Sequence, residues 1–177
     1  MTHQPIRISV NVSARQWIDE HFPHVVEQAL SDSGLDPTCL ELELTESAIF
    51  QTNGHVMSVL RRLKSLGIRI SIDDFGAGFS SLGYLKDFPL DSLKVDRMFV
   101  SELTTNAKHV AITTSVIALA KNMGLKSIAE GVETAEQLAI LIAHGCQEAQ
   151  GYYFSRPIDA TEAARLVQQG HHFSITV

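Results

Sequence analysis

A unit of one strand and one helix repeats along this chain, and the repeat constrains the fold more than any other feature. Short segments of alternating apolar residues are each followed by a longer segment with helical periodicity. Glycine stands just after five helical segments, where a left-handed backbone often ends a helix; these are Gly34, Gly67, Gly124, Gly145 and Gly170. Strands that alternate with helices every ~30 residues predict a parallel sheet with right-handed crossovers.

The repeat predicts six units. Strands are expected at residues 6–12, 40–44, 68–73, 92–96, 125–130 and 146–151. Helices are expected at residues 23–33, 55–66, 107–123, 135–143 and 160–169. The third strand is expected to lead into an irregular loop and a short helix near residues 81–86.

The alternation within the strands distinguishes two architectures. Strands covered by helices on both faces usually read as continuous apolar runs. Here the run Arg-Ile-Ser-Ile-Asp at 69–73 has one apolar and one polar face, and Ile6, Ile8 and Val10 alternate with polar residues in the same way. A polar face suits a barrel lumen that leads to a site at the C-terminal ends of the strands. We therefore predict an α/β fold of the TIM-type (β/α)₈ barrel rather than a doubly wound sheet.

The length of the chain sets an expectation for its domain organisation. A complete eight-unit barrel takes ~250 residues. The 177 residues are expected to form a single domain, 1–177, with about six of the βα units and without the N-terminal part. Such a barrel would have open strand edges, which favour self-association or a complementing segment.

Composition excludes several classes of protein. A net charge of −6 argues against a protein that binds a nucleic-acid polymer, because such a protein has a basic face. Cys39 and Cys146 are isolated, which is typical of a reducing compartment. The start of the chain is not a signal peptide, and we expect no membrane segment and a cytoplasmic location.

Polar groups that can bind a metal or a phosphate follow every predicted strand. They are Asn11, Glu43 with Glu46, Asp73 with Asp74, Lys94 with Asp96, Glu130 with Glu133, and Gln150. Adjacent carboxylates repel each other unless a cation or a proton lies between them. Oxygen ligands suit Mg²⁺, Mn²⁺ or Ca²⁺. A pair of such cations can activate water and neutralise the charge of a phosphate, and a lysine can stabilise the transition state.

Each of these residues also has a purely structural interpretation. Asn11 can close the turn after its strand, and Glu133 is favoured in the first turn of a helix. Lys94 can form an ion pair inside the lumen, Glu46 can cap a loop, and Gln150 can satisfy backbone groups. We favour the functional interpretation for the set, because chance would not place such groups after all six strands.

Six motifs together resemble the EAL domain family, bacterial phosphodiesterases that act on cyclic di-GMP. They cover almost the whole chain in the family's order. They are Val-Asn-Val-Ser at 10–13, Glu-Leu-Thr-Glu at 43–46, Asp-Asp-Phe-Gly-x-Gly at 73–78, Leu-Lys-Val-Asp at 93–96, Ala-Glu-Gly-Val-Glu-Thr at 129–134 and Gln-Gly-Tyr-x-Phe-Ser-x-Pro at 150–157.

The resemblance implies a (β/α)₈-type barrel that hydrolyses cyclic di-GMP to linear pGpG with two Mg²⁺ or Mn²⁺ ions. It implies five metal ligands, which are Asn11, Glu43, Asp73, Asp74 and Glu130. Signalling proteins of this kind carry upstream sensory or GGDEF-type domains, which are possible partners of this chain.

The resemblance also implies catalytic and supporting roles. Lys94 corresponds to a lysine that contacts the catalytic water, and Gln150 to a residue that helps to position it. Glu130 and Glu133 are counted with the catalytic group, Glu133 as a supporting acid. Glu46 would brace the loop after Asp74, which includes Phe75, Gly76 and Gly78. That loop and the helix after it imply a homodimer.

The sequence departs from the family pattern in two places. Ala77 and Phe79 replace the threonine and tyrosine that are usual in the loop, and the Glu-Ala-Leu tripeptide, expected on a strand before Asn11, does not occur in the chain. Its glutamate is itself a metal ligand in the family. Two alternatives follow: an inactive domain that serves as a cyclic di-GMP receptor or a protein-interaction module, and a response-regulator receiver domain. Acids after the second and fifth strands argue against the receiver domain.

Overall fold

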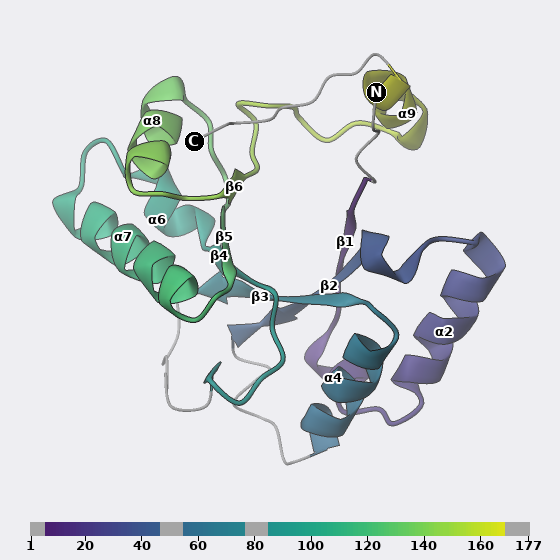
Figure 1. The fold of residues 1–177 in the computed structure, drawn as a ribbon. Helices are drawn as coiled ribbons and strands as arrows, with labels where there is room; N and C mark the ends of the chain where they lie inside the picture. Colours follow the sequence, from purple (N-terminus) through teal and green to yellow (C-terminus); the bar gives the residue numbers. More distant parts are fainter. Residues whose placement is uncertain (1–5, 47–54, 77–84, 169–177) are drawn as a thin grey trace.

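Six parallel strands form one sheet whose spatial order follows the sequence (Figure 1). The computed structural model describes residues 6–46, 55–76 and 85–168. The strands are β1 (Ile8–Asn11), β2 (Leu40–Thr45), β3 (Arg69–Phe75), β4 (Ser92–Val95), β5 (Lys126–Ala129) and β6 (Glu148–Ala149). All six predicted strands are present, and β1 and β6 are shorter than predicted.

Apart from the C-terminal helix, the longer helices lie on the convex side of the curved sheet (Figure 1). The longer ones are α2 (Phe22–Ser33), α4 (His55–Ser65), α7 (Ala107–Asn122), α8 (Ala135–Ala143) and α9 (Ala160–Gln168), close to the predicted ranges. Three short elements were not predicted: α1 (Ala14–Trp17), the 3₁₀ helix η1 (Pro37–Cys39) and α6 (Arg97–Ser101). The short helix predicted near 81–86 falls mostly outside the described residues.

The ends of the helices follow the predicted glycine pattern. Gly34, Gly67, Gly124 and Gly145 all have a positive φ, the conformation that glycine adopts without a steric penalty. Gly170 lies outside the described residues.

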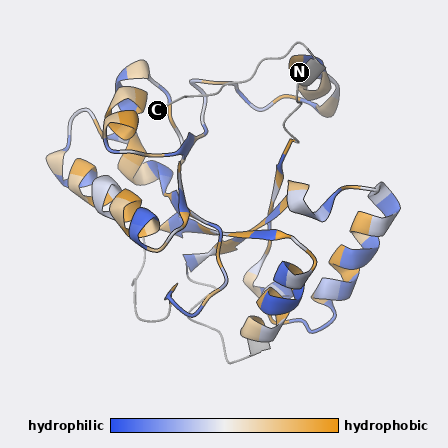
Figure 2. Cartoon of the chain, viewed as in Figure 1, coloured by the Kyte–Doolittle hydropathy of each residue, from blue (hydrophilic) through white to orange (hydrophobic). Residues whose placement is uncertain are grey.

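The register of the sheet separates an apolar outer face from a polar inner face. Leu42 pairs with Ile70 and Ile72 pairs with Leu93, whereas Glu43 pairs with Ser71 on the opposite face. Ile70, Ile72 and Leu93 are completely buried against the helices. Figure 2 shows apolar and hydrophilic residues together on α2 and α7, as expected for helices with one face on the core. Helices on one face and a polar lumen on the other agree with an incomplete (β/α)₈ barrel and not with a doubly wound sheet.

The two ends of the sheet differ from its centre. Among the described residues, β1 pairs only with β2, and β6 pairs only with β5. The apolar residues on the outer face of β1, Ile8 and Val10, are exposed by 49% and 43%, and Ile6, just before the strand, by 54%. In the described part of the chain, no helix combines the length and the apolar character needed to cross a bilayer.

Candidate metal centre

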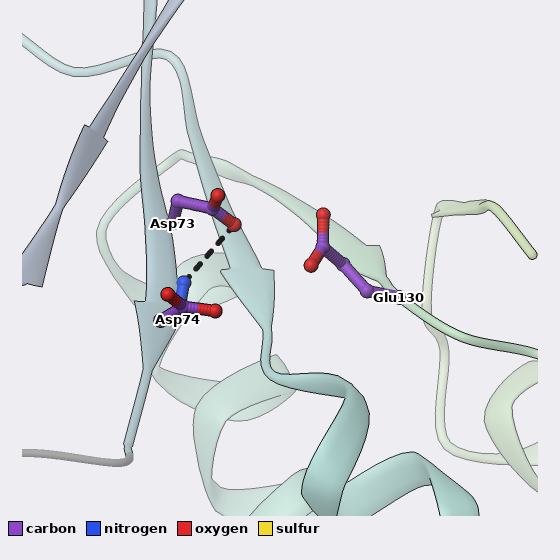
Figure 3. Close-up of side chains that lie close together, drawn as sticks. All are labelled: Asp73, Asp74 and Glu130. Carbon is purple, nitrogen blue, oxygen red and sulfur yellow. Dashed lines mark hydrogen bonds between the residues drawn. The ribbon is translucent and has the colours of Figure 1, made fainter. Parts of the chain in front are cut away.

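Three carboxylates meet at the C-terminal ends of the strands (Figure 3). Asp73 and Asp74 come from β3 and Glu130 follows β5; one oxygen of each lies within 4.8 Å of the others. Adjacent strand residues normally point to opposite faces. Asp74 reaches the same place as Asp73 because its φ is 55° and the register shifts between Ile72 and Phe75. The backbone N–H of Asp74 donates to Oδ1 of Asp73 at 3.0 Å.

The ammonium group of Lys94 lies within this cluster. Its Nζ is 2.7 Å from Oε2 of Glu43 and 3.2 Å from Oδ1 of Asp73, and it also contacts Oε1 of Glu130. The side chain is only 3% exposed. Burial favours the neutral amine, but hydrogen bonds to Glu130 and Glu43 outweigh this effect, so the pKa of Lys94 is raised. Lys94 is therefore a fixed positive charge shared by three acidic side chains.

The pKa values of Glu130 and Asp74 are raised despite the nearby positive charge of Lys94. Burial raises the pKa of Glu130, and the charges of Asp73 and Glu43 add to this, although Lys94 opposes it. The pKa of Asp74 is raised by burial and then by the charge of Asp73. A cation between these carboxylates would relieve the repulsion that raises both pKa values.

Neighbouring strands hold the remaining predicted ligands and Gln150 in place. Asn11 and Glu43 face each other across the β1–β2 pairing. The side-chain amide of Gln150 donates to Oε1 of Glu130 at 2.6 Å, and its backbone N–H donates to the carbonyl of Ala129 at 2.8 Å. Gln150 therefore bonds to a member of the acidic cluster, a more specific partner than the backbone groups considered from the sequence.

The donor set fits a hard divalent cation. The grouped side chains offer carboxylate oxygens, and the predicted ligand Asn11 would add an amide oxygen; these are ligands that Mg²⁺ and Mn²⁺ prefer. Within the described residues, no cysteine or histidine belongs to the group that the structure brings together.

A hydrogen bond to Glu46 holds the start of the loop that follows Asp74. Oε2 of Glu46, at the end of β2, accepts the backbone N–H of Gly76 at 3.1 Å. Gly76 has a φ of 99°, and a side chain there would come within 3.2 Å of the ring of Phe99. Phe75 is buried in the core. Gly78 lies outside the described residues, so the predicted bracing role of this group stays a prediction.

Two of the strand-end acids have partners outside the cluster. Glu133 pairs with Arg97 at 3.0 Å, and both side chains are exposed. Asp96 caps α6 by accepting the backbone N–H of Met98 at 2.7 Å. Lys94 thus contacts Asp73, whereas Asp96 serves as a helix cap.

An open cleft of about 440 Å³ adjoins Glu130 and Gln150. The sequence analysis assigned no role to its two arginines or to Tyr152. The guanidinium of Arg156 lies 4.9 Å from the centre of the Tyr152 ring. The cleft is lined by Arg97, Glu130, Gly131, Glu133, Gln150, Gly151, Tyr152, Ser155, Arg156, Pro157 and Ile158.

Close backbone packing joins the two turns that carry Gly131 and Gly151 beside this cleft. A Cβ on Gly151 would lie 2.2 Å from the carbonyl oxygen of Val132, and the N–H of Val132 donates to the carbonyl of Gln150 at 3.0 Å. Gly131 has a φ of 68° and faces the side chain of Arg97. The glycines of the fifth and sixth strand-end motifs therefore allow the two turns to touch, which sets Glu130 beside Gln150.

The fold and the site together define an incomplete parallel β/α barrel with a cluster of carboxylates at the strand ends. The family described as "EAL domain" matches residues 1–157. The chain belongs to the EAL domain family.

Relatives with known names and structures agree with this family. The cyclic di-GMP phosphodiesterase NbdA of Pseudomonas aeruginosa is 43% identical over 156 residues, which is 88% of this chain and 20% of NbdA. A solved structure of the PaMucR phosphodiesterase in complex with c-di-GMP is 40% identical, with a TM-score of 0.85 over 89% of this chain and 64% of that one.

A manganese and cyclic di-GMP complex of BlrP1 from Klebsiella pneumoniae is 32% identical, with a TM-score of 0.79 over 85% of this chain and 39% of BlrP1. The chain spans about a fifth of the length of the curated relatives it matches.

Proposed function

We propose that this chain hydrolyses cyclic di-GMP to linear pGpG in a reaction that depends on Mg²⁺ or Mn²⁺. The observation that carries the proposal is the placement of Lys94 among Glu43, Asp73 and Glu130 at the open end of the lumen. A buried lysine shared by several acids is a costly arrangement that a fold without a charged ligand would not need. Relatives named as cyclic di-GMP phosphodiesterases support the choice of substrate.

The reaction adds one water molecule across one phosphodiester bond. The water oxygen bonds to phosphorus while the bond from phosphorus to the 3′ oxygen breaks, and a proton from the water ends on that 3′ oxygen. The second phosphodiester stays intact, so the product is linear. A bound divalent cation supplies Lewis-acid activation of the water and neutralises charge on the phosphate.

The residues of this chain would hold and complement that chemistry. Five side chains are proposed as ligands of two cations: Asn11, Glu43, Asp73, Asp74 and Glu130. The ammonium of Lys94 is positioned to stabilise negative charge that develops on the reacting phosphate. Gln150 fixes Oε1 of Glu130 by a hydrogen bond of 2.6 Å. Glu133 is proposed as a supporting acid through its exposed ion pair with Arg97.

The cleft beside Glu130 has groups that suit a nucleotide. Arg97 and Arg156 supply positive charge at its wall, and the ring of Tyr152 offers an apolar face. Guanidinium groups bind phosphates by paired hydrogen bonds, and bases stack on aromatic rings. The substrate would therefore extend from the acidic cluster into this cleft.

Three wider properties are proposed with the activity. The loop and helix after Asp74 would form a homodimer interface, and a sensory or GGDEF-type domain would regulate the chain. A cytoplasmic location is proposed because Cys39 and Cys146 are both free thiols.

Incubation of the purified chain with cyclic di-GMP and Mn²⁺, followed by chromatography of the nucleotides, tests the proposal. We expect pGpG, no pGpG after addition of a chelator, and a loss of at least ~10³-fold in rate for Asp73→Asn. A matched control is Asp91→Asn. Asp91 lies just before β4, at the opposite end of the strand from the acidic cluster, and it pairs with Lys64. A folded chain that binds cyclic di-GMP without forming pGpG would instead indicate a receptor.

A further inference from the structure

The end strand β1 has a second attachment besides its pairing with β2, and this attachment crosses the lumen. The guanidinium of Arg7, just before β1, contacts two carboxylates on different strands. Its Nη1 is 2.9 Å from Oε2 of Glu41 on β2, and its Nη2 is 3.0 Å from Oε1 of Glu148 on β6. Arg7 thus joins the two ends of the sheet, 141 residues apart in the sequence.

The two carboxylates are held by further groups on the same level of the lumen. The hydroxyl of Ser92 on β4 donates to Oε1 of Glu41 at 2.7 Å. Nζ of Lys126 on β5 is 2.5 Å from Oε1 of Glu148. These five side chains, called here the lower layer, connect β1, β2, β4, β5 and β6.

The lower layer is built around a buried charge. The side chain of Glu41 is 1% exposed, and in the described structure Arg7 is the cation that pairs with it. A buried carboxylate that loses its cation is strongly destabilised. Arg7 also reaches both oxygens of Glu148, the forked geometry that makes arginine pairs directional.

The same faces of the two end strands carry residues of the metal centre. Arg7 and Asn11 are four residues apart, so both point into the lumen, with Asn11 about 13 Å further along β1. Glu148 and Gln150 are two residues apart and also share a face. A shift or tilt of β1 at the level of Arg7 would therefore move Asn11 relative to Glu43.

We propose that Arg7 is a positioning residue that clamps β1 to β6 across the lumen and thereby holds Asn11 in the metal centre. The clamp acts on the strand and does not touch the substrate. Its effect on the metal centre rests on the proposed function, whereas its effect on β1 does not.

Amide hydrogen exchange and Mn²⁺ binding test the clamp. The N–H of Val12 donates to the carbonyl of Glu43 at 3.1 Å and reports on the β1–β2 contact next to Asn11. In Arg7→Met, NMR should show exchange of this amide at least ~10-fold faster than in the wild type. Mn²⁺ affinity, measured from the paramagnetic resonance of free Mn²⁺, should fall by ~10-fold or more, the usual effect of losing a group that orients a ligand.

Two further variants separate the clamp from general destabilisation. Lys126→Met also removes a cation from Glu148, but β5 is paired on both sides, so Val12 exchange and Mn²⁺ affinity should stay within ~2-fold of the wild type. Arg7→Lys keeps the charge but has no fork to reach both acids, so it should restore part of each effect.

Either of two outcomes would overturn the proposal. Val12 exchange in Arg7→Met that matches the wild type would show that β1 is not clamped. Faster exchange with unchanged Mn²⁺ affinity would show a structural role alone. A wild-type chain that binds no Mn²⁺ would contradict the proposed function and with it the link to the metal centre, and Val12 exchange would then decide the clamp by itself.

Discussion

The centre of the sheet and its ends carry the same alternating pattern but different structures. Ile70 and Ile72 on β3 are completely buried, whereas Ile8 and Val10 on β1, in equivalent outward positions, are exposed by 49% and 43%. β3 has a paired strand on each side and α4 packed against it, whereas β1 pairs only with β2 in the described structure. Alternation therefore determines which face a residue occupies, and neighbours determine how deeply it is buried.

The polar face shows the same contrast. At the centre, Lys94 is fixed by three acids from three other strands. At the ends, Asn11 lies opposite Glu43 in the β1–β2 pairing, and the side chain of Gln150 bonds to Glu130. The central cluster should therefore tolerate little change, and the ends should respond in proportion to the contact that is lost.

The largest expected effect follows removal of the central charge. In Lys94→Met, Glu43, Asp73 and Glu130 lose their shared cation, and the transition state loses a positive charge. We expect pGpG formation to fall by ~10³-fold or more in a chromatographic assay. Lys126→Met is the matched control on the neighbouring strand, with expected activity near that of the wild type. Equal losses in both variants would refute the central role of Lys94.

A matched pair of isoleucines compares burial at the centre and the end directly. Ile72→Ala leaves a cavity in the core and should lower the free energy of unfolding by about 2–5 kcal/mol. Ile8→Ala removes a half-exposed side chain and should lower it by less than about 1 kcal/mol. Urea denaturation measures both. A cost for Ile8→Ala as large as that for Ile72→Ala would mean that the end strand is covered in solution.

The smallest expected effect depends on pH and concerns the lower layer. Burial would raise the pKa of Glu148, but hydrogen bonds from Arg7 and Lys126 outweigh it, so the pKa is lowered from 4.5. A lowered pKa stabilises the folded state above the unfolded pKa, and this stability is lost as the pH falls through the folded pKa.

Glu148→Gln should therefore lower the free energy of unfolding by no more than about 1 kcal/mol near neutral pH, because Glu148 is partly exposed. Urea denaturation at a series of pH values should show this difference shrinking below about pH 4.5. A difference that grows as the pH falls would contradict the assigned direction of the pKa shift.

The sequence was sufficient for features that depend on local pattern. The run at 69–73 predicted which residues face the lumen, and glycines such as Gly34 and Gly67 predicted the ends of helices. It was not sufficient for the left-handed backbone of Asp74, because a φ of 55° is uncommon for any residue other than glycine. The short helices α1 and α6 were also missed, since four or five residues are too few for a periodic signal.

Partners across the lumen depend on strand order rather than on local pattern. The motifs placed Glu43, Lys94 and Glu130 at strand ends, but their contacts with one another follow from parallel pairing in sequential order. In the local sequence, Arg7 is one polar residue in a strand of alternating apolar and polar residues. Its contact with Glu148 is between residues 141 positions apart, and no short window of the sequence contains both.

The central claim is that the strand ends gather Asp73, Asp74 and Glu130 into a divalent-cation site. Diffraction from crystals of the chain soaked in Mn²⁺, measured at a wavelength where manganese scatters anomalously, tests it most directly. We predict anomalous peaks bonded to the carboxylates of these three residues, and their loss in Asp73→Asn. Peaks only at surface acids, or no peak in a folded crystal, would contradict the account.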